Sequence, residues 1–168
     1  MGQINYPSID ELYLELEDKY PDKSTAKEDA IKFAGLLLKS GIGAGDKIAI
    51  IAPESYESAI ATFGANAIGV QVVTMRPIDE VEVKPFYDGL DAYRPKMVLF
   101  YNSSAAWMSA VKSYAKYIEV YLAAQPIDPY TQQYFGFRSA IDSIDISLKD
   151  TLREIKRHSK DDVAENIS

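Results

Sequence analysis

A chain of 168 residues suits one domain or a large subdomain, and 47% of its residues are hydrophobic, as in ordinary globular proteins. The net charge of −7, from 18 basic and 25 acidic residues, argues against nucleic-acid partners and against a polybasic membrane anchor. Because the chain has no cysteine and only one histidine, disulfides, thiolate catalysis and multi-histidine metal sites are excluded.

The sequence also lacks targeting and membrane signals. No stretch approaches the roughly 20 apolar residues of a membrane span, and the first 20 residues lack the basic start and apolar run of a signal peptide. The one histidine, His158, lies in a basic stretch near the expected end of a helix, where a cation is favourable. We therefore expect a soluble, cytoplasmic protein with no membrane span and no metal site.

Two helices are predicted before the first strand. One follows Pro7, begins with the Ser8–Glu11 capping box and ends at Pro21. The other spans about residues 25–40 and ends at Gly41, the position of a left-handed helix cap. Apolar residues at helical spacing define its buried face, namely Ala30, Phe33, Ala34 and Leu37.

Four short apolar runs are then predicted to be strands, at residues 46–53, 70–75, 96–101 and 117–123. A helix follows each of the first three. The first of these helices is capped by Ser55 and ends at Gly69. The second begins at Pro85 and directs Phe86, Leu90 and Tyr93 inward. The third is capped by Ser103 or Ser104 and contains Trp107, Met108 and Val111.

This alternation predicts an α/β fold with a mostly parallel sheet and helices on both faces. We assign residues 1–124 to this α/β subdomain. Within 125–168 we expect a loop over 125–137, an amphipathic helix and a frayed polar tail. Ser147 and Asp150 mark the start of that helix, and one of its sides carries Leu148, Leu152 and Ile155.

Gly41, Gly43 and Gly45, followed by Lys47, resemble a phosphate-binding loop only in residue composition. Such a loop needs a strand before the glycines and a helix after them, so that helix N–H groups point at the phosphates. Here a helix precedes the glycines and a strand follows, and the Walker spacing places Asp46 where the second glycine belongs. We interpret these glycines as a helix-to-strand turn.

The segments "GIGAGDKIAIIAPESYES" and "ANAIGVQVVTMRP" carry a different signal. Their order resembles the N-terminal subdomain of the adenylate-forming enzymes, which comprise acyl-CoA synthetases, luciferases and peptide-synthetase adenylation domains. The matching features are Gly45-Asp46, a Pro-Asn-x-x-Glu-like turn at Pro53 to Glu57 with Glu54 in place of asparagine, the Ala67–Val70 closure, Pro77 and "YRPKMVLF". The similarity runs from about Ile9 to Val120 and is closest in character to long-chain or aryl acyl-CoA synthetases.

The resemblance implies carboxylate activation by ATP to an acyl-adenylate, then thioester formation with CoA, in fatty-acid or related metabolism. It implies ATP, Mg²⁺ and CoA for the full-length parent. Within these 168 residues, however, we find no Ser/Thr/Gly-rich loop ending in Pro-Lys, no Tyr-x-x-Thr-Glu segment, no ribose-binding aspartate and no catalytic C-terminal lysine. The stretch from Asp22 to Ala30 is also too short for a hairpin typical of the family.

We therefore expect an N-terminal piece of a ligase that is catalytically inert alone, binds no cofactor itself and packs against the remaining subdomains. The carboxylic acid substrate would belong to the whole enzyme. No catalytic residue or acid–base pair is assigned. Ser55 and Arg76 are candidate binding residues, because each follows the carboxyl end of a predicted strand; helix capping for Ser55 and an interface role for Arg76 are the alternatives.

Two other functions remain open. One is a stand-alone, non-catalytic binding or regulatory module that docks on a partner through a tyrosine-rich surface. That surface would use the crowded tyrosines Tyr114, Tyr117, Tyr121, Tyr130 and Tyr134. The other is an independent flavodoxin-like or nucleotide-binding domain, which is disfavoured because no strand is followed by a glycine-rich turn.

Overall fold

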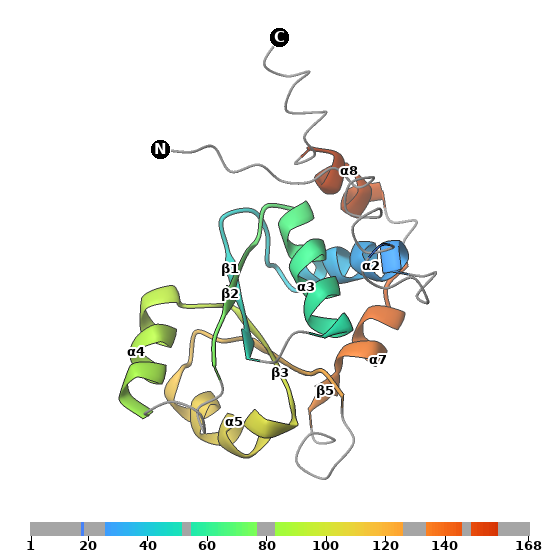
Figure 1. Ribbon diagram of the computed structural model, residues 1–168. Coiled ribbons are helices and arrows are strands. Elements are labelled where there is room, and N and C mark those ends of the chain that lie inside the picture. Colours follow the sequence, from blue (N-terminus) through green and yellow to red (C-terminus); the bar gives the residue numbers. More distant parts are fainter. Residues whose placement is uncertain are drawn as a thin grey trace.

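The computed structural model describes Asp18 and residues 26–51, 55–76, 83–125, 134–145 and 149–157 (Figure 1). Strands and helices alternate through most of this part of the chain. In chain order the elements are α2 (Ala26–Lys39), β1 (Lys47–Ile51), α3 (Tyr56–Ala67), β2 (Gln71–Thr74), α4 (Val83–Tyr93), β3 (Met97–Phe100), α5 (Asn102–Tyr114), β4 (Val120–Ala123), β5 (Phe135–Gly136), α7 (Phe137–Asp142) and α8 (Lys149–Arg157).

The five strands form one parallel sheet in the order β2-β1-β3-β4-β5. Ile48 of β1 is in register with Val72 on one side and with Met97 on the other, and Met97 is in register with Val120. The first crossover therefore leads outward from β1 to β2, whereas the later connections add β3, β4 and β5 on the opposite side. This arrangement confirms the predicted parallel α/β sheet.

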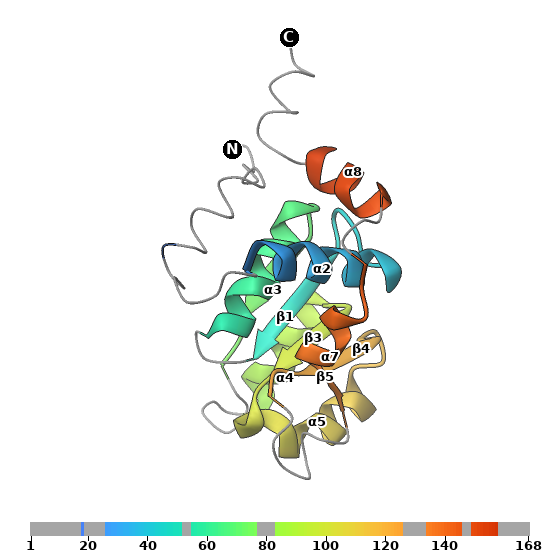
Figure 2. The same cartoon turned by 90° about the vertical axis from the view of Figure 1, so that its right-hand side faces the viewer.

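Helices cover both faces of the sheet, as predicted (Figures 1 and 2). Alternate residues of β1 enter different cores because successive side chains of a strand point to opposite faces. Ile48 and Ile50 belong to a core built with α2, α3, α7 and α8, whereas Ala49 and Ile51 belong to a core built with α4 and α5. Both cores are almost wholly apolar.

Helices α2 and α3 approach each other closely where α3 has a glycine. A Cβ atom on Gly64 would lie 2.6 Å from the carbonyl oxygen of Ala30 and 3.2 Å from the Cβ of Phe33. Any larger residue would force the two helices apart. The predicted buried face of α2 is confirmed, since Ala30, Phe33, Ala34 and Leu37 are all buried.

Two expectations about α4 and α5 are wrong. Tyr93 is 44% exposed rather than inward, and its ring lies 5.9 Å from the ammonium group of Lys47. Helix α5 begins at Asn102, so Ser103 and Ser104 lie inside it, and the cap residue Tyr101 makes no side-chain capping bond. The strand thus passes directly into the helix without a serine cap.

The end of the predicted loop over 125–137 also differs from expectation. Phe135 and Gly136 pair with β4 as the edge strand β5, and α7 follows immediately. The ring of Phe137 packs 5.6 Å from that of Phe33, which draws this segment onto the core of α2. In α8, Ile155 is buried as predicted, but Leu152 is 43% exposed and Thr151 is buried in its place.

Other predictions fall outside the described residues: the helix with Ser8 and Glu11, the cap at Ser147 with Leu148, and His158. Across the part of the chain that the structure describes, no helix has the length and apolar character needed to cross a membrane.

Candidate functional site at the carboxyl edge of the sheet

In an open parallel sheet, ligands bind outside the carboxyl ends of the strands, at the point where the strand order reverses. That point lies between β1 and β3 in the order 2-1-3-4-5. Helix α3 leaves β1 toward one face of the sheet and α5 leaves β3 toward the other. We call the edge where the strands' carboxyl ends lie the carboxyl edge, and it is the candidate site.

A half-buried carboxylate, Glu57, occupies the carboxyl edge from the first turn of α3. Its Oε1 atom accepts a hydrogen bond of 2.8 Å from Nε2 of Gln125, which follows β4. The same oxygen accepts a longer bond of 3.3 Å from the hydroxyl of Tyr101, which follows β3. One carboxylate thus connects the segments that follow the carboxyl ends of three strands, β1, β3 and β4. Its negative charge is favourable at the amino end of a helix.

Ser55, predicted as a binding or capping residue, is the N-cap of α3. Its Oγ accepts a hydrogen bond from the backbone N–H of Ser58 at 3.2 Å, and Oγ of Ser58 accepts one from the backbone N–H of Ser55 at 2.9 Å. The two serines form a reciprocal capping box, so the capping interpretation is confirmed. A binding role for Ser55 stays a prediction.

Arg76, the other candidate, follows β2 and is exposed. Within the described ranges it forms no ion pair and no hydrogen bond to Glu57 or to any other side chain. The structure therefore does not bring Ser55 and Arg76 together into one polar cluster. The binding or interface role of Arg76 stays a prediction.

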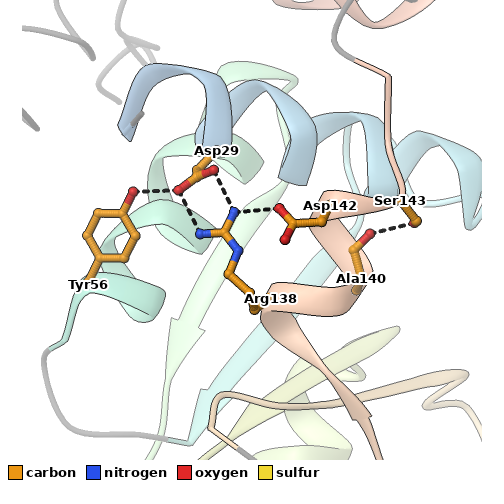
Figure 3. A network of polar contacts seen from close by, with 6 residues as sticks. All are labelled: Asp29, Tyr56, Arg138, Ala140, Asp142 and Ser143. Carbon is orange, nitrogen blue, oxygen red and sulfur yellow. Dashed lines mark hydrogen bonds and ion pairs between the residues drawn. The ribbon is translucent and has the colours of Figure 1, made fainter. Parts of the chain in front are cut away.

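A second polar network adjoins this edge and is shown in Figure 3. Asp29 of α2 is only 2% exposed, and its Oδ2 accepts a 2.6 Å bond from the hydroxyl of Tyr56, the first residue of α3. Arg138 of α7 binds the same carboxylate with both terminal nitrogens, at 2.7 Å and 3.1 Å. Arg138 also donates a 2.9 Å bond to Asp142.

The charge balance of this network favours an ionised Asp29. Burial alone raises the pKa of Asp29, but hydrogen bonds from Arg138 and Tyr56 outweigh it and hold the pKa below its ordinary value of 3.8. The hydrogen bond to Asp29 raises the pKa of Arg138 in turn. The network fixes the start of α3, which carries Glu57, against α2 and α7.

The glycine turn lies at the opposite edge of the sheet, where the strands begin. Gly41 and Gly45 have φ angles of +78° and +90°, a left-handed conformation that suits glycine. The N–H of Gly43, one of the donors that a phosphate would need, donates instead to Oδ2 of Asp46 at 2.9 Å. The interpretation of these glycines as a structural turn is confirmed, and Asp46 also pairs with Lys96 at 3.1 Å.

Among the described residues, no three histidine, aspartate or glutamate side chains group as metal ligands. Sequence reasoning found Ser55 as a candidate binding residue after the first strand, and Glu57 as part of the turn at Pro53 to Glu57. It missed Tyr101 and Gln125, whose only signal is their position one residue after β3 and two residues after β4.

No protein-family model and no curated protein matches this sequence. Solved structures of adenylate-forming enzymes match its fold. The anthranilate CoA ligase AuaEII, solved with anthranoyl-AMP, is 14% identical with a TM-score of 0.67, over 88% of this chain and 29% of its own. A luciferase-like enzyme from the mealworm Zophobas morio is 18% identical with a TM-score of 0.64, over 83% of this chain and 35% of its own.

A benzoate CoA ligase from Burkholderia xenovorans LB400 is 18% identical with a TM-score of 0.56, over 71% of this chain and 22% of its own. The chain thus spans about a third of the length of these enzymes or less. At such low identity the likeness establishes the fold alone, and it agrees with the resemblance read from Gly45-Asp46 and the segments around it. The chain has the α/β fold of the N-terminal domain of adenylate-forming ligases.

Proposed function

We propose that this chain is the N-terminal α/β part of an ATP-dependent, AMP-forming acid–thiol ligase. The observation that carries the proposal is its fold match to a CoA ligase over 88% of this chain but only 29% of the ligase. In the reaction, a carboxylate attacks the α-phosphate of ATP to give an acyl-adenylate and pyrophosphate. The thiol of CoA then attacks the acyl carbon, forming the thioester and releasing AMP.

The described residues do not fit ATP and Mg²⁺ as ligands. A triphosphate needs cationic side chains or free N–H donors. Arg76 is an exposed cation after β2, but the carboxyl edge also presents the Glu57 carboxylate, and the N–H of Gly43 is bound to Asp46. Repulsion between Glu57 and a phosphate would oppose binding there. We therefore assign the nucleotide, CoA and the carboxylic acid to the remaining subdomains, and we expect this chain alone to be inert.

The role that fits this chain is structural support for that larger enzyme. Its sheet is fixed at the carboxyl edge by Glu57 and by the network around Asp29, so the edge is preorganised. A long-chain or aryl carboxylic acid is the proposed substrate class of the parent, and a cytoplasmic location is part of the same proposal.

The test uses the polypeptide made in the native cell, immunoprecipitated with an antibody raised against residues 26–157. We expect a product larger than 18.7 kDa that catalyses ATP–pyrophosphate exchange dependent on an added carboxylic acid, with benzoate and a long-chain fatty acid as probes. The 168-residue chain purified alone should give no exchange, and its melting temperature should not respond to millimolar ATP and Mg²⁺.

Two results would overturn the proposal. Exchange by the 168-residue chain alone would show that it holds a nucleotide site of its own. A native product of 18.7 kDa without exchange activity would instead favour the non-catalytic binding module.

A further inference from the structure

One side of the molecule carries an exposed aromatic surface formed by α4 and α5. We define the α5 surface as Val83, Tyr87, Trp107, Ala110 and Tyr114. The last three are spaced i, i+3 and i+7, so they share one face of α5. The ring of Tyr114 lies 4.4 Å from that of Tyr87, which joins this face to α4, and Val83 lies one turn before Tyr87 on the same side of α4.

The α5 surface is exposed, and its α5 part is poor in charge, whereas its α4 border carries the exposed ion pair of Lys84 and Asp88. Val83 is 52% exposed, Tyr114 51% and Trp107 40%. Of the 13 residues of α5 only Lys112 is charged, about 8%, compared with 26% for the whole chain. The other exposed residues between Trp107 and Tyr114 are serine and alanine. Solvent-facing helices normally carry charged residues on their outer face, so this composition indicates a covered surface.

The aromatic groups are held in place before any partner arrives. Asp91 of α4 accepts hydrogen bonds from the hydroxyls of Tyr114, at 2.6 Å, and Tyr117, at 3.0 Å. The guanidinium of Arg94 packs 4.3 Å from the ring of Tyr117. Contacts of this kind reduce the side-chain entropy that binding must overcome. Tyrosine and tryptophan in such settings are typical of the energetically important residues of protein interfaces.

We propose that the α5 surface is where the remaining polypeptide of the parent ligase docks, an inference that rests on the proposed function. The matched anthranilate CoA ligase has 71% of its length (100% minus the 29% covered) with no counterpart in this chain. A partner of that size must bury an area of the chain, and the aromatic face of α5, with Lys112 as its one charged residue, loses less solvation free energy than a charged face when water is removed. The partner segment is therefore apolar, with hydrogen-bond donors at its rim near Asp91, because a carboxylate only accepts hydrogen bonds.

Hydroxyl-radical footprinting tests this contact directly, because Trp107 is the only tryptophan in the chain. The comparison is between the 168-residue chain and the immunoprecipitated native polypeptide. We expect oxidation of Trp107 and Tyr114 to fall from the level of half-exposed rings to that of buried ones in the native polypeptide. Phe135, at 57% exposure and outside the α5 surface, serves as the internal control and should react in both samples.

A paired variant adds a second readout. The W107S/Y114S substitution should leave the 168-residue chain folded, since both rings are exposed, but should lower carboxylate-dependent exchange by the native polypeptide. The matched control L152S removes an exposed apolar side chain from α8. It should lower neither the stability of the 168-residue chain nor the exchange activity of the native polypeptide.

The outcomes separate the two proposals. A larger, exchange-active polypeptide in which Trp107 stays as reactive as in the isolated chain would overturn the docking site and leave the proposed function standing. Protection of Trp107 that appears in the 168-residue chain itself and grows with its concentration would assign the surface to a second copy, which also overturns it. A native product of 18.7 kDa would remove both proposals together.

Discussion

The ion pair between Asp29 and Arg138 should make a large contribution to stability, and Arg138→Met tests it. The substitution removes two hydrogen bonds to a carboxylate that is 2% exposed, and it leaves Tyr56 as the remaining donor shown in Figure 3. Removing one partner of a fully buried pair costs about 3–5 kcal/mol. Arg138 is itself 51% exposed, so solvent screens part of the interaction and the expected loss is smaller.

We expect Arg138→Met to lower the free energy of unfolding by about 2–3 kcal/mol at pH 7. For a chain of this size that corresponds to a fall of roughly 4–12 °C in melting temperature. Urea denaturation monitored by circular dichroism measures the loss. The control is Arg153→Met, because the Arg153–Asp150 pair spans 3.6 Å with both side chains more than two-thirds exposed; its loss should stay below about 0.5 kcal/mol.

The pH dependence gives an independent check. The pKa of Asp29 is lowered in the folded state, so this carboxylate contributes stability above its unfolded pKa of about 4, and the contribution disappears as the pH falls through the folded pKa. The stability gap between wild type and Arg138→Met should therefore be complete at pH 6 and shrink below about pH 4. A gap that is unchanged down to pH 3, or a loss at pH 7 no larger than that of Arg153→Met, would refute the reasoning.

Three further substitutions test single contacts by urea denaturation. Tyr121→Phe should stabilise the chain by about 1 kcal/mol, because the Tyr121 hydroxyl is buried with no hydrogen-bond partner in the described structure. Burial also raises the pKa of Tyr121 to about 12. A loss of stability in this variant would contradict the prediction. Gly64→Ala should cost about 1–3 kcal/mol, since its Cβ would lie 2.6 Å from the Ala30 carbonyl oxygen, whereas a neutral result would show that α2 and α3 can separate freely. Ser55→Ala should cost about 1 kcal/mol through loss of the α3 cap, and an unchanged midpoint would mean that the capping bond contributes little.

The repeating part of the fold could be predicted from the sequence because its signals are local. Each of the strands β1 to β4 is a short apolar run, and the helices around them show apolar residues at helical spacing. Gly41 and Gly69 marked the ends of α2 and α3, and both have positive φ angles. Such patterns need only neighbouring residues to be recognised.

The segment after β4 could not be predicted because its structure depends on distant residues. Strand β5 has two residues and α7 has six, too few to show a period. Phe137 is held by Phe33, and Arg138 by Asp29, 109 residues earlier in the chain. The loop was inferred from its prolines and aromatics, but tertiary contacts override that local preference. The candidate site could be predicted only in part for the same reason. Glu57 is recognisable from its position after β1, whereas its hydrogen-bond donors, Tyr101 and Gln125, are 44 and 68 residues away in sequence.

The carboxyl edge of this chain differs from that of the doubly wound sheets that bind nucleotides. In doubly wound sheets that hold phosphates, a glycine-rich turn leads from strand to helix and leaves N–H groups free for the ligand. Here the helix that follows β1 is capped by a serine, with the N–H of Ser58 bound to Ser55, and its first turn carries a carboxylate held by Tyr101 and Gln125. These hydrogen bonds tie strand ends to one another rather than to a ligand. A sheet preorganised in this way suits a part of a ligase that supports a neighbouring catalytic subdomain, and the exchange assay distinguishes that role from a site of its own.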